Sequence, residues 1–441
     1  MNKLEAALRE IDAEPGDRIR VVTDDRTYEG VLMPHHAFSG AGIVTVKLDS
    51  GYNVGLSIED ATLSLLEKQQ SGQPELREAP MDPEKPTVAL LGTGGTIASY
   101  VDYETGAVHP ARTSEDIASS VPDIFDVCNV DAAIVAQKLS ENMVPADWTN
   151  IASVTAEKLN NGASGVIVAH GTDTMHYTAA ALSFMLQELS GPVVLVGSQR
   201  SSDRPSSDAF QNLVAAARVA VTDLGEVAVV MHAEPSPGVC AVHRGTKVRK
   251  MHASRRDAFR SIDAKPLAFV DTDVHFTGAY RRKTDGDARV AAELNDNVAL
   301  VYAHPGLDED AFAAMTEGRD GIVIAGTGLG HLNEELIPSV RELTSSDIPV
   351  VMTTQCIYGR VNLHVYSNGR RLLQAGVIPG GDMLPEVALV KLMWVLANVP
   401  AGEVAETMQR NLAGELSERT LYDTFPQQKT YMEDNINGQR T

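Results

Sequence analysis

Cysteine is scarce in this chain, and its distribution limits the possible classes of protein. Cys128, Cys240 and Cys356 are the three cysteines among 441 residues, an odd number that is widely scattered. A disulfide framework or a cysteine-based zinc site needs several cysteines at short, regular spacings. The sequence therefore argues against both, and it predicts no metal site. Cys356 has no paired base nearby, so we expect it to be a buried packing residue.

Long hydrophobic runs are also missing. The chain has no stretch of about 18 uninterrupted apolar residues, the length that a membrane-spanning helix needs. Residues Met1–Glu14 have the mixed charge of an amphipathic helix and lack the apolar region of a secretory signal. We therefore expect a cytoplasmic protein.

Basic residues, and lysine above all, are few. The chain has 12 Lys and 25 Arg against 59 Asp and Glu, which gives a net charge of −22. This charge fits either ordinary solubility or adaptation to a salty cytoplasm, in which acidic surfaces stay soluble while salt screens them. It disfavours RNA binding over the general surface. An RNA partner would have to meet a local basic patch or bind through another subunit.

Residues 1–67 have the pattern of a small β-barrel domain. Short apolar stretches separated by tight turns are typical of an SH3- or Sm-like barrel. We expect a docking domain, because such a module is too small to be an enzyme. Residues 68–86 are polar and contain prolines, which predicts an exposed linker. The expected strands are Arg18–Val22, Thr27–Leu32, Gly42–Leu48 and Asn53–Leu56.

From Thr87 onward, apolar strands alternate with helical stretches, which predicts an α/β fold with a parallel sheet and helices on both faces. The polar stretch 285–297 has helical potential, and a tail helix is expected over Glu403–Leu416. The expected parts are an N-terminal catalytic domain (87–290), a C-terminal domain (291–400) and a helical, then polar tail (401–441). The expected strands include Val193–Val196, Val227–Met231, Val298–Ala303, Gly321–Ala325 and Val350–Thr353.

The most informative motif follows the apolar run Val88–Leu91, which indicates a buried parallel strand. The chain then turns on three glycines and delivers the hydroxyl of Thr96 at the carboxyl end of that strand. Ligands bind at this edge of open α/β sheets, and glycines let backbone N–H groups approach a bound oxygen. A nucleotide-binding turn is the alternative, but Ile97 stands where its last glycine should be, and no lysine follows.

A second motif repeats this arrangement. The buried strand Val166–Ala169 is followed by His170 and Gly171, and then by a second threonine, Thr172, with the carboxylate of Asp173 beside it. Two strand-end threonines and a neighbouring aspartate indicate nucleophilic chemistry on a carbonyl. A helix N-cap is the alternative for the Thr-Asp pair, and both roles can coexist.

The segments TGGTIA and HGTDTM resemble the signature motifs of the type I/II asparaginase–glutaminase family. The resemblance covers the chain from residue 87 to about residue 400. It implies an asparaginase-like, two-domain, parallel-sheet body that follows the small SH3/Sm-like β-barrel. It also implies that Thr96 is the nucleophile and that Thr172 and Asp173 complete the reacting group.

The resemblance also implies a lysine. The family's lysine precedes a phenylalanine, and Lys250 has the matching spacing to Phe259, whereas the spacing of Lys247 is three residues too long. A threonine hydroxyl is a weak nucleophile until a base takes its proton, and a lysine amine can be that base. Asp173 can hold the lysine and also bind a substrate ammonium. The alternative for Lys250 is a surface position in a basic cluster.

Other candidates concern substrate binding. The segment Leu139–Met143 resembles the part of the family that binds the substrate's α-carboxylate and α-ammonium, which makes Ser140 and Glu141 candidates. A solvated loop is the alternative for these two residues. Backbone groups at Gly95 and Gly171 are expected to approach the substrate.

A mobile lid in the family carries a tyrosine soon after the nucleophile. Tyr100, Tyr103 and His109 lie in that region of this chain, and none matches cleanly; Tyr103 is the candidate. The segment Gly326–Asn333 resembles the C-terminal loop that helps to build the interface between protomers in the family.

The N-terminal module favours one branch of the family. Ordinary asparaginases carry no such barrel. A barrel, a linker and an asparaginase-like body together resemble the D-subunit family of archaeal glutamyl-tRNA(Gln) amidotransferases. This resemblance implies a glutaminase that releases ammonia to a partner, the amidotransferase E subunit, which uses ATP and Mg²⁺ to convert glutamyl-tRNA(Gln) to glutaminyl-tRNA(Gln). It further implies a homodimeric core in a heterotetramer that binds tRNA(Gln) mainly through the partner.

Two other functions remain open at this point: a free-standing L-asparaginase with an extra domain, and a non-catalytic RNA-docking scaffold. The intact set of Thr96, Thr172, Asp173 and Lys250 argues against the scaffold. No cofactor is expected in this chain, because it shows no ATP-binding motif.

Overall fold

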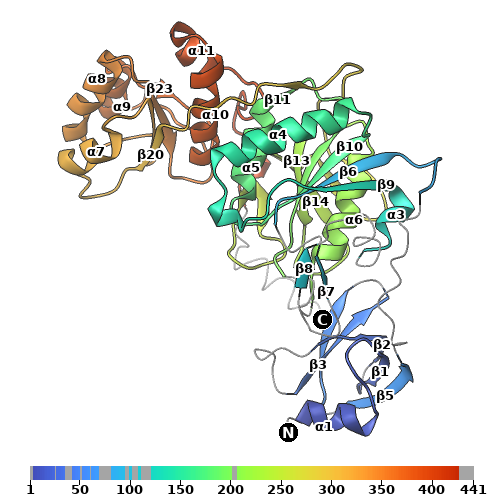
Figure 1. Cartoon of the computed structure of the whole chain (residues 1–441). Coiled ribbons are helices and arrows are strands. Elements are labelled where there is room, and N and C mark those ends of the chain that lie inside the picture. Colours follow the sequence, from blue (N-terminus) through green and yellow to red (C-terminus); the bar gives the residue numbers. More distant parts are fainter. Residues whose placement is uncertain are drawn as a thin grey trace. The chain divides into compact units, whose positions relative to one another are not determined.

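The computed structural model describes residues 3–24, 26–34, 42–49, 52–59, 61–68, 81–94, 121–200 and 206–426, and the backbone at 99–101 and 108–110. The chain divides into two compact units. The first comprises residues 1–260 and 266–296, and the second comprises residues 261–265 and 297–441. Figure 1 follows the chain by colour from the blue N-terminal domain to the orange and red second unit.

The N-terminal domain is a five-stranded antiparallel sheet in the order β4-β3-β2-β1-β5. Ile19 and Val21 of β1 have no exposed surface, and Leu4 of helix α1 (Lys3–Glu10) joins their core. The predicted small β domain is confirmed, but the fifth strand was not predicted. That strand lies at an edge of the sheet, where most of its side chains are partly exposed and its apolar pattern is weak. The strands are β1 (Arg18–Val22), β2 (Thr27–Leu32), β3 (Ile43–Leu48), β4 (Asn53–Ser57) and β5 (Thr62–Glu67).

The body of the first unit is an eight-stranded sheet in the order β18-β17-β14-β13-β12-β10-β6-β9. The five strands from β9 to β13 in this order are parallel. From β6 the chain passes to β9 on one side and then to β10 on the other, so the strand order reverses at β6. Ligands of such sheets bind outside the carboxyl ends of the strands at this switch point. The parallel strands are β6 (Thr87–Gly92), β9 (Asn129–Ile134), β10 (Gly165–Ala169), β12 (Val193–Val196) and β13 (Val227–His232).

The predicted parallel sheet is confirmed in these five strands, and three further strands at one end of the sheet make it mixed. Strands β14 (Cys240–Arg244), β17 (Ala268–Val270) and β18 (Val274–Phe276) run antiparallel to their neighbours. The connection between β13 and β14 spans only residues 233–239. It is too short for the crossover between parallel strands, which takes roughly a dozen residues or more.

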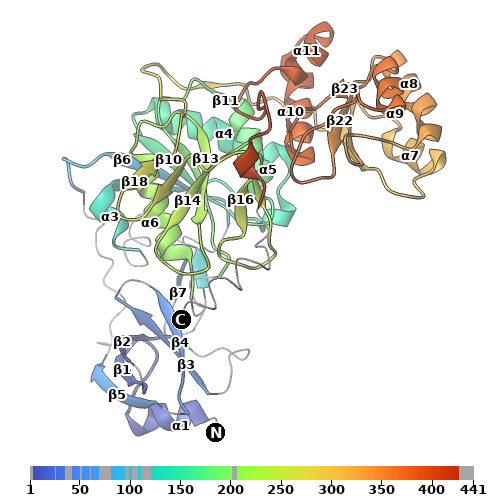
Figure 2. The same cartoon turned by 180° about the vertical axis from the view of Figure 1, so that it is seen from behind.

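Helices cover both faces of this sheet, as Figures 1 and 2 show from opposite sides. Helices α3 (Ile124–Val127) and α6 (Ala209–Ala220) pack on one face, and α4 (Pro145–Asn160) and α5 (Met175–Met185) cover the other. All five residues of β10 are buried. This explains the continuous apolar runs of the sequence, because a strand covered on both faces has no polar side.

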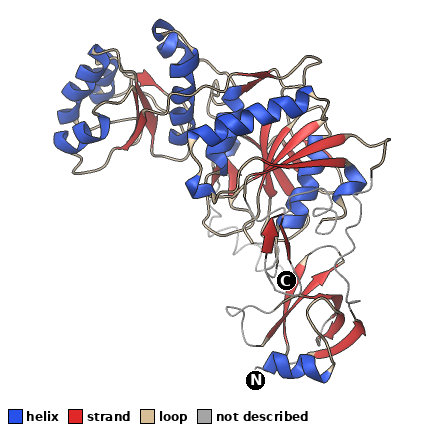
Figure 3. Ribbon diagram, viewed as in Figure 1, coloured by secondary structure: helices blue, strands red, loops and turns tan. Residues whose placement is uncertain are grey.

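Short strand pairs complete the described part of the first unit (Figure 3), and one of them lies where the sequence predicted helix. Within 285–297 the chain forms only β19, and the helical expectation was wrong. Here the backbone bonds to side chains of α4: Asn160 Oδ1 accepts from Ala288 N, and Thr149 donates to the Ala292 carbonyl. The pairs are β7 (Ser99–Val101) with β8 (Val108–Pro110), β11 (Leu186–Gln187) with β19 (Arg289–Val290), and β15 (Val248–Lys250) with β16 (Phe259–Ser261).

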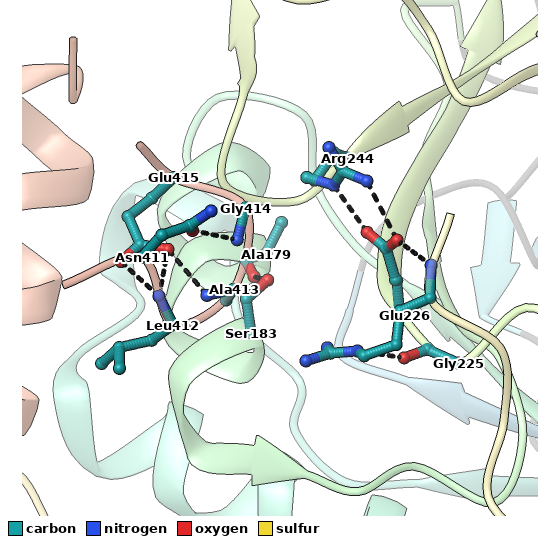
Figure 4. A network of polar contacts seen from close by, with 11 residues as sticks. Ala179, Ser183, Gly225, Glu226, Arg244, Asn411, Leu412, Ala413, Gly414 and Glu415 are labelled. Carbon is teal, nitrogen blue, oxygen red and sulfur yellow. Dashed lines mark hydrogen bonds and ion pairs between the residues drawn. The ribbon is translucent and has the colours of Figure 1, made fainter. Parts of the chain in front are cut away.

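A buried carboxylate fixes the start of β13. Arg244 of β14 donates two hydrogen bonds to Glu226, at 2.6 and 3.0 Å, as Figure 4 shows. The backbone N–H of Arg281 donates a third, at 2.7 Å. Glu226 is only 5% exposed. A carboxylate this deeply buried is stable only because its oxygens are paired in this way.

The second unit has a four-stranded parallel sheet in the order β20-β21-β22-β23. Phe312, Val340 and Leu372 join the core on the face that α7, α8 and α9 cover, while α10 packs along the other face. The predicted strands of this unit are confirmed. The elements are β20 (Val298–Tyr302), β21 (Gly321–Gly326), β22 (Val350–Thr354), β23 (Ile378–Pro379), α7 (Glu309–Thr316), α8 (Ile337–Ser345), α9 (Ser367–Gln374), α10 (Pro385–Asn398) and α11 (Val404–Gln409).

The tail helix is shorter than predicted, since α11 ends at Gln409. A buried ion pair replaces the remaining helical turns. Lys391 of α10 bonds Glu415 at 2.6 Å, and neither side chain has exposed surface. The Glu415 carboxylate also accepts from the backbone of Leu412 and Ala413, as Figure 4 shows. This pairing holds the chain after α11 in a non-helical path. Residues 427–441 of the tail lie outside the described residues.

The cysteines differ in environment. Cys128 and Cys240 are buried, and burial raises the pKa of each thiol to about 12, so neither is a reactive thiolate. Cys356 is exposed, so its predicted role in buried packing was wrong. It follows the carboxyl end of β22, where the chain leaves the sheet. Among the described helices, none is long and apolar enough to cross a membrane.

Candidate active site

The two threonine motifs start side by side. Strands β6 and β10 pair in parallel until Gly92 lies opposite Ala169, and the N–H and hydroxyl of Thr93 then both donate to the Ala169 carbonyl, at 3.1 and 2.9 Å. The following Gly94 has a φ of +110°, and a Cβ there would lie 2.5 Å from the backbone nitrogen of Lys138. Only glycine fits this turn.

Three of the predicted site residues follow this turn in the sequence. Gly95, Thr96 and Tyr103 lie outside the described residues. Their assignment as substrate-binding backbone, nucleophile and lid stays a prediction of the sequence motif.

The second motif meets the predicted lysine. Lys250 Nζ, at the end of β15, lies 2.9 Å from Thr172 Oγ1 and 2.7 Å from Asp173 Oδ1. The Lys250 side chain is 10% exposed, whereas that of Asp173 is 66% exposed. The amine is therefore shielded from water, while the carboxylate remains open to a ligand.

Lys247, the competing lysine, lies in the turn between β14 and β15 and is only 2% exposed. From the sequence, a substitution there is expected to be mild. Its burial changes what such a substitution measures, because loss of a fully buried side chain affects the fold as well as the site. The contact with Thr172 is made by Lys250.

A salt-bridge cluster holds the segment that presents Lys250. Arg255 donates two hydrogen bonds to Asp257, at 2.8 and 2.9 Å, and Arg260 donates to the same carboxylate. The Arg255 hydrogen bonds keep the pKa of the buried Asp257 below its usual range. The N–H of Met251 closes the loop by donating to the Ala258 carbonyl at 2.7 Å. The arginines on both sides of Asp257 were a sign of this cluster in the sequence.

Ser140, which lies in a different segment of the chain, forms hydrogen bonds with the second motif. It is 4% exposed, its Oγ accepts from the N–H of Asp173 at 3.3 Å, and its carbonyl accepts from the hydroxyl of Thr174 at 2.6 Å. A Cβ at Gly171 would lie 2.8 Å from Ser140, so only glycine fits against it. Glu141 is exposed in the same 3-10 turn. Ser140 therefore contacts the Thr-Asp loop, and Glu141 lies on its solvent side.

A buried network behind the motif was not predicted. His170 Nδ1 lies 2.7 Å from the Gly171 carbonyl oxygen, and its Nε2 lies 2.9 Å from Thr178 Oγ1 of α5. Trp148 Nε1 of α4 donates to the same hydroxyl at 3.0 Å. Trp148 is 30 positions from Thr178 in the sequence, and no local pattern links it to the histidine.

Burial keeps the nearby histidines neutral. It lowers the pKa of His170 to about 4, and together with the cations of Arg249 and Lys250 it lowers that of His176 to about 3. In the described part of the chain, no group of three or more His, Cys, Asp or Glu side chains could hold a metal ion.

Two buried histidines, His170 beside the motif and His243 of β14, make the stability depend on pH. His170 and His243 have folded pKa values of about 4 and about 3, below the ordinary 6.5. As the pH falls below 6.5, the unfolded chain takes up protons that the folded chain cannot, so stability is lost between 6.5 and the folded pKa. We expect each to cost about 2 kcal/mol at pH 5, from 1.4 kcal/mol per pH unit.

The urea midpoint, followed by circular dichroism between pH 7 and pH 5, tests this. Replacing His243 by Gln should flatten the pH dependence, while replacing the exposed His364 should leave it unchanged. A midpoint independent of pH over this range would contradict the prediction.

A doubly wound body whose switch point carries a hydrogen-bonded threonine, aspartate and lysine defines an asparaginase-type amidohydrolase. The "Asparaginase, N-terminal" model matches residues 87–282, and the "Glutaminase/Asparaginase C-terminal domain" model matches residues 297–409. The "GatD N-terminal domain" model matches residues 13–66. The chain belongs to the family of glutamyl-tRNA(Gln) amidotransferase D subunits.

Relatives of this family match nearly the whole chain. The glutamyl-tRNA(Gln) amidotransferase D subunit of Pyrococcus furiosus is 49% identical over 436 residues, which cover 96% of this chain and 99% of that protein. The corresponding D subunit of Thermococcus kodakarensis is 50% identical over 422 residues, which cover 93% of this chain and 96% of that protein.

Solved structures of asparaginases match a smaller part. The thermostable L-asparaginase from Thermococcus kodakarensis is 34% identical with a TM-score of 0.68, and the match covers 76% of this chain and all of that one. L-asparaginase I from Vibrio cholerae is 29% identical with a TM-score of 0.66, covering 76% of this chain and 99% of that one. These structures support the predicted asparaginase-like fold.

Proposed function

We propose that this chain is the glutaminase component of a tRNA-dependent amidotransferase. It hydrolyses glutamine and releases the ammonia with which a partner protein converts glutamyl-tRNA(Gln) to glutaminyl-tRNA(Gln). The observation that carries the proposal is the 2.9 Å contact between Lys250 Nζ and Thr172 Oγ1, in a chain that matches D subunits over nearly its whole length.

The chemistry follows from the contacts of Lys250. In its neutral form the amine can donate one hydrogen bond to Asp173 and accept the proton of the Thr172 hydroxyl. Loss of that proton makes the threonine oxygen a stronger hydrogen-bond acceptor or nucleophile. Asp173 thereby orients the amine. By the family resemblance, Thr96 attacks the glutamine carboxamide, with Thr172 and Lys250 carrying protons; direct attack by water is the other possible order.

Substrate recognition is proposed for the exposed side of the same loop. The Asp173 carboxylate is 66% exposed next to a buried amine, a suitable partner for the α-ammonium of an amino acid. The backbone of Gly171 and Gly95, with Ser140 and Glu141, is proposed to hold the rest of glutamine. Ser140 contributes mainly through the backbone of Asp173, which it already contacts.

The partner is proposed to be the amidotransferase E subunit, which supplies the ATP- and Mg²⁺-dependent activation and most of the tRNA(Gln) contacts. Support comes from the chain itself, which carries no ATP-binding motif, and from its acidic net charge of −22, which disfavours RNA binding over the general surface. A homodimer of this chain is proposed as the core of a heterotetramer. The proposed compartment is the cytoplasm.

A free-standing L-asparaginase is the second candidate, and coverage argues against it. The asparaginase structure from Thermococcus kodakarensis matches 76% of this chain with its full length, whereas the D subunit of Pyrococcus furiosus matches 96% of it. The additional sequence includes the N-terminal domain at residues 13–66. A non-catalytic scaffold has no use for the Thr172–Lys250–Asp173 contacts.

A coupled assay tests the proposal. The purified chain, alone and with its partner and glutamyl-tRNA, is given glutamine or asparagine, and ammonia and glutaminyl-tRNA are both measured. We expect glutamine hydrolysis to rise when partner and charged tRNA are present. Rapid asparagine hydrolysis by the isolated chain, unaffected by the partner, would instead support the free-standing asparaginase.

Deletion of residues 1–80 should weaken partner assembly or tRNA-dependent activation and spare the hydrolytic machinery. Every candidate site residue lies after this segment, and the N-terminal domain has its own core around Ile19, Val44 and Val46. Domains with separate cores can usually be separated. Partner binding and tRNA-stimulated glutaminase activity are compared for the truncated and full chains.

The same experiment can reject the docking role. Unchanged partner binding and unchanged stimulation would show that the domain does not dock. Loss of folding on truncation would show that it is part of the core of the first unit.

A further inference from the structure

The loop that carries Thr172 and Asp173 is bracketed by one buried side chain. His170 follows the last residue of β10, and its Nδ1 meets the Gly171 carbonyl at 2.7 Å, at the start of the loop. Its Nε2 meets Thr178 Oγ1 at 2.9 Å, one turn into α5. His170 is 1% exposed. The imidazole ring therefore connects the two ends of the loop from the protein interior.

The contacts define the state of the ring. Trp148 Nε1 can only donate, and it donates to Thr178 Oγ1 at 3.0 Å, which leaves the threonine hydroxyl hydrogen to donate to His170 Nε2. The Gly171 carbonyl can only accept, so His170 Nδ1 carries the ring proton. The neutral Nδ1–H tautomer thus uses each donor in the network once. Burial lowers the pKa of His170 to about 4, in agreement with a neutral ring.

The opposite side of the loop is held by a separate contact. Ser140 accepts from the N–H of Asp173 and from the Thr174 hydroxyl. Between these supports, the Thr172 hydroxyl and the Asp173 carboxylate are both directed to Lys250. The peptide between Gly171 and Thr172 is the part of the loop that His170 fixes.

We propose that His170 is a positioning residue: by donating from Nδ1 to the Gly171 carbonyl and accepting from Thr178, it orients the Gly171–Thr172 peptide so that the Thr172 hydroxyl meets Lys250 and the substrate carboxamide. This inference rests on the proposed glutaminase function. His170 touches neither Lys250 nor substrate in this role. Its loss should therefore lower kcat more than it raises KM, because misplacing a reacting group affects the transition state most.

Two substitutions separate the two halves of the ring. The amide nitrogen of Asn lies as many bonds from Cα as Nδ1, so His170→Asn can keep the bond to Gly171. The amide oxygen of Gln corresponds to Nε2, so His170→Gln can keep only the bond from Thr178. His170→Leu keeps neither.

The test uses the full chain with its partner and charged tRNA. It measures kcat and KM for glutamine, together with the melting temperature of each variant. We expect His170→Asn to stay within about 3-fold of the wild-type kcat, and His170→Gln and His170→Leu to lose about 10- to 100-fold, with KM for glutamine changed less than about 3-fold. Wild-type kcat in His170→Leu would overturn the proposal, and so would equal losses in all three variants.

A matched pair of threonine variants tests the proposal even if the histidine variants fail to fold. Thr178→Val deletes the hydroxyl that donates to His170, and Thr155→Val deletes an equally buried hydroxyl on α4, whose Oγ1 has no hydrogen-bond partner in the described structure. We expect kcat to fall about 3- to 10-fold in the first variant and to stay unchanged in the second. Equal kcat values in the two variants would overturn the proposal.

The failures of the two proposals are distinguishable. Absence of glutamine hydrolysis in the wild-type complex would reject the glutaminase function. An active wild-type enzyme with fully active His170 and Thr178 variants would reject only the positioning role.

Discussion

Replacing Lys250 by methionine should lower the kcat for glutamine hydrolysis by about 10³-fold while the fold stays intact. The amine is the group that bonds the Thr172 hydroxyl and the Asp173 carboxylate, and methionine has a similar length but no proton to exchange. Steady-state ammonia release by the complex, with circular dichroism of the variant, measures this. Thr172→Val should cause a loss of similar size.

The double variant and a control sharpen the result. Groups that act as a unit are not additive, so Lys250→Met with Thr172→Val should be about as inactive as either single variant. Lys283→Met, at an exposed lysine of the same unit, should keep wild-type activity. Turnover of Lys250→Met within about 10-fold of the wild type, with a normal melting temperature, would show that this lysine is not the base.

Thr96→Ala should lower the rate of glutamine-dependent glutaminyl-tRNA formation by about 10³-fold or more. The rate of ammonia-dependent formation should stay unchanged. Thr96 is assigned as the nucleophile by the family motif that follows β6, and amidation of the tRNA-bound glutamate is proposed for the partner protein. Free ammonia therefore bypasses the missing step. The measurement is glutaminyl-tRNA formed by the variant complex with glutamine or with an ammonium salt as nitrogen donor.

Two outcomes would contradict this assignment. Near-native glutamine use by a correctly folded Thr96→Ala complex would exclude Thr96 as the nucleophile. Loss of the ammonia-dependent reaction as well would place the defect in assembly with the partner.

Much of the fold could be predicted from the sequence because local patterns determine it. The runs Val88–Leu91 and Val166–Ala169 are apolar at every position, as required of strands that helices cover on both faces. The glycine turn after β6 could be predicted because glycine is the residue that such a turn requires. The structure gives the reason, since the backbone at Gly94 has a positive φ and no room for a Cβ. These patterns determined the class of fold and the edge of the sheet where a site would lie.

The chemistry of the candidate site was only partly local. Thr172 and Asp173 were found from their place after a strand. Lys250 is 78 positions from Thr172 and was found only through a family motif, since no spacing rule joins residues that distant. The structure brings the three side chains together, and it shows Lys250 itself in contact with Thr172.

What the sequence by itself determined was which segments must be buried and which residue types stand at the strand ends. Only the tertiary structure decided where side-chain contacts take the place of the backbone hydrogen bonds of an expected helix. The helical expectation for 285–297 failed because α4 side chains such as Asn160 take up the backbone hydrogen bonds, and α11 ends early where Glu415 pairs with Lys391. The ring of His170 spans its loop because buried polar groups must find partners, and the tertiary structure brings Trp148, 30 positions away, to the Thr178 hydroxyl that completes this network.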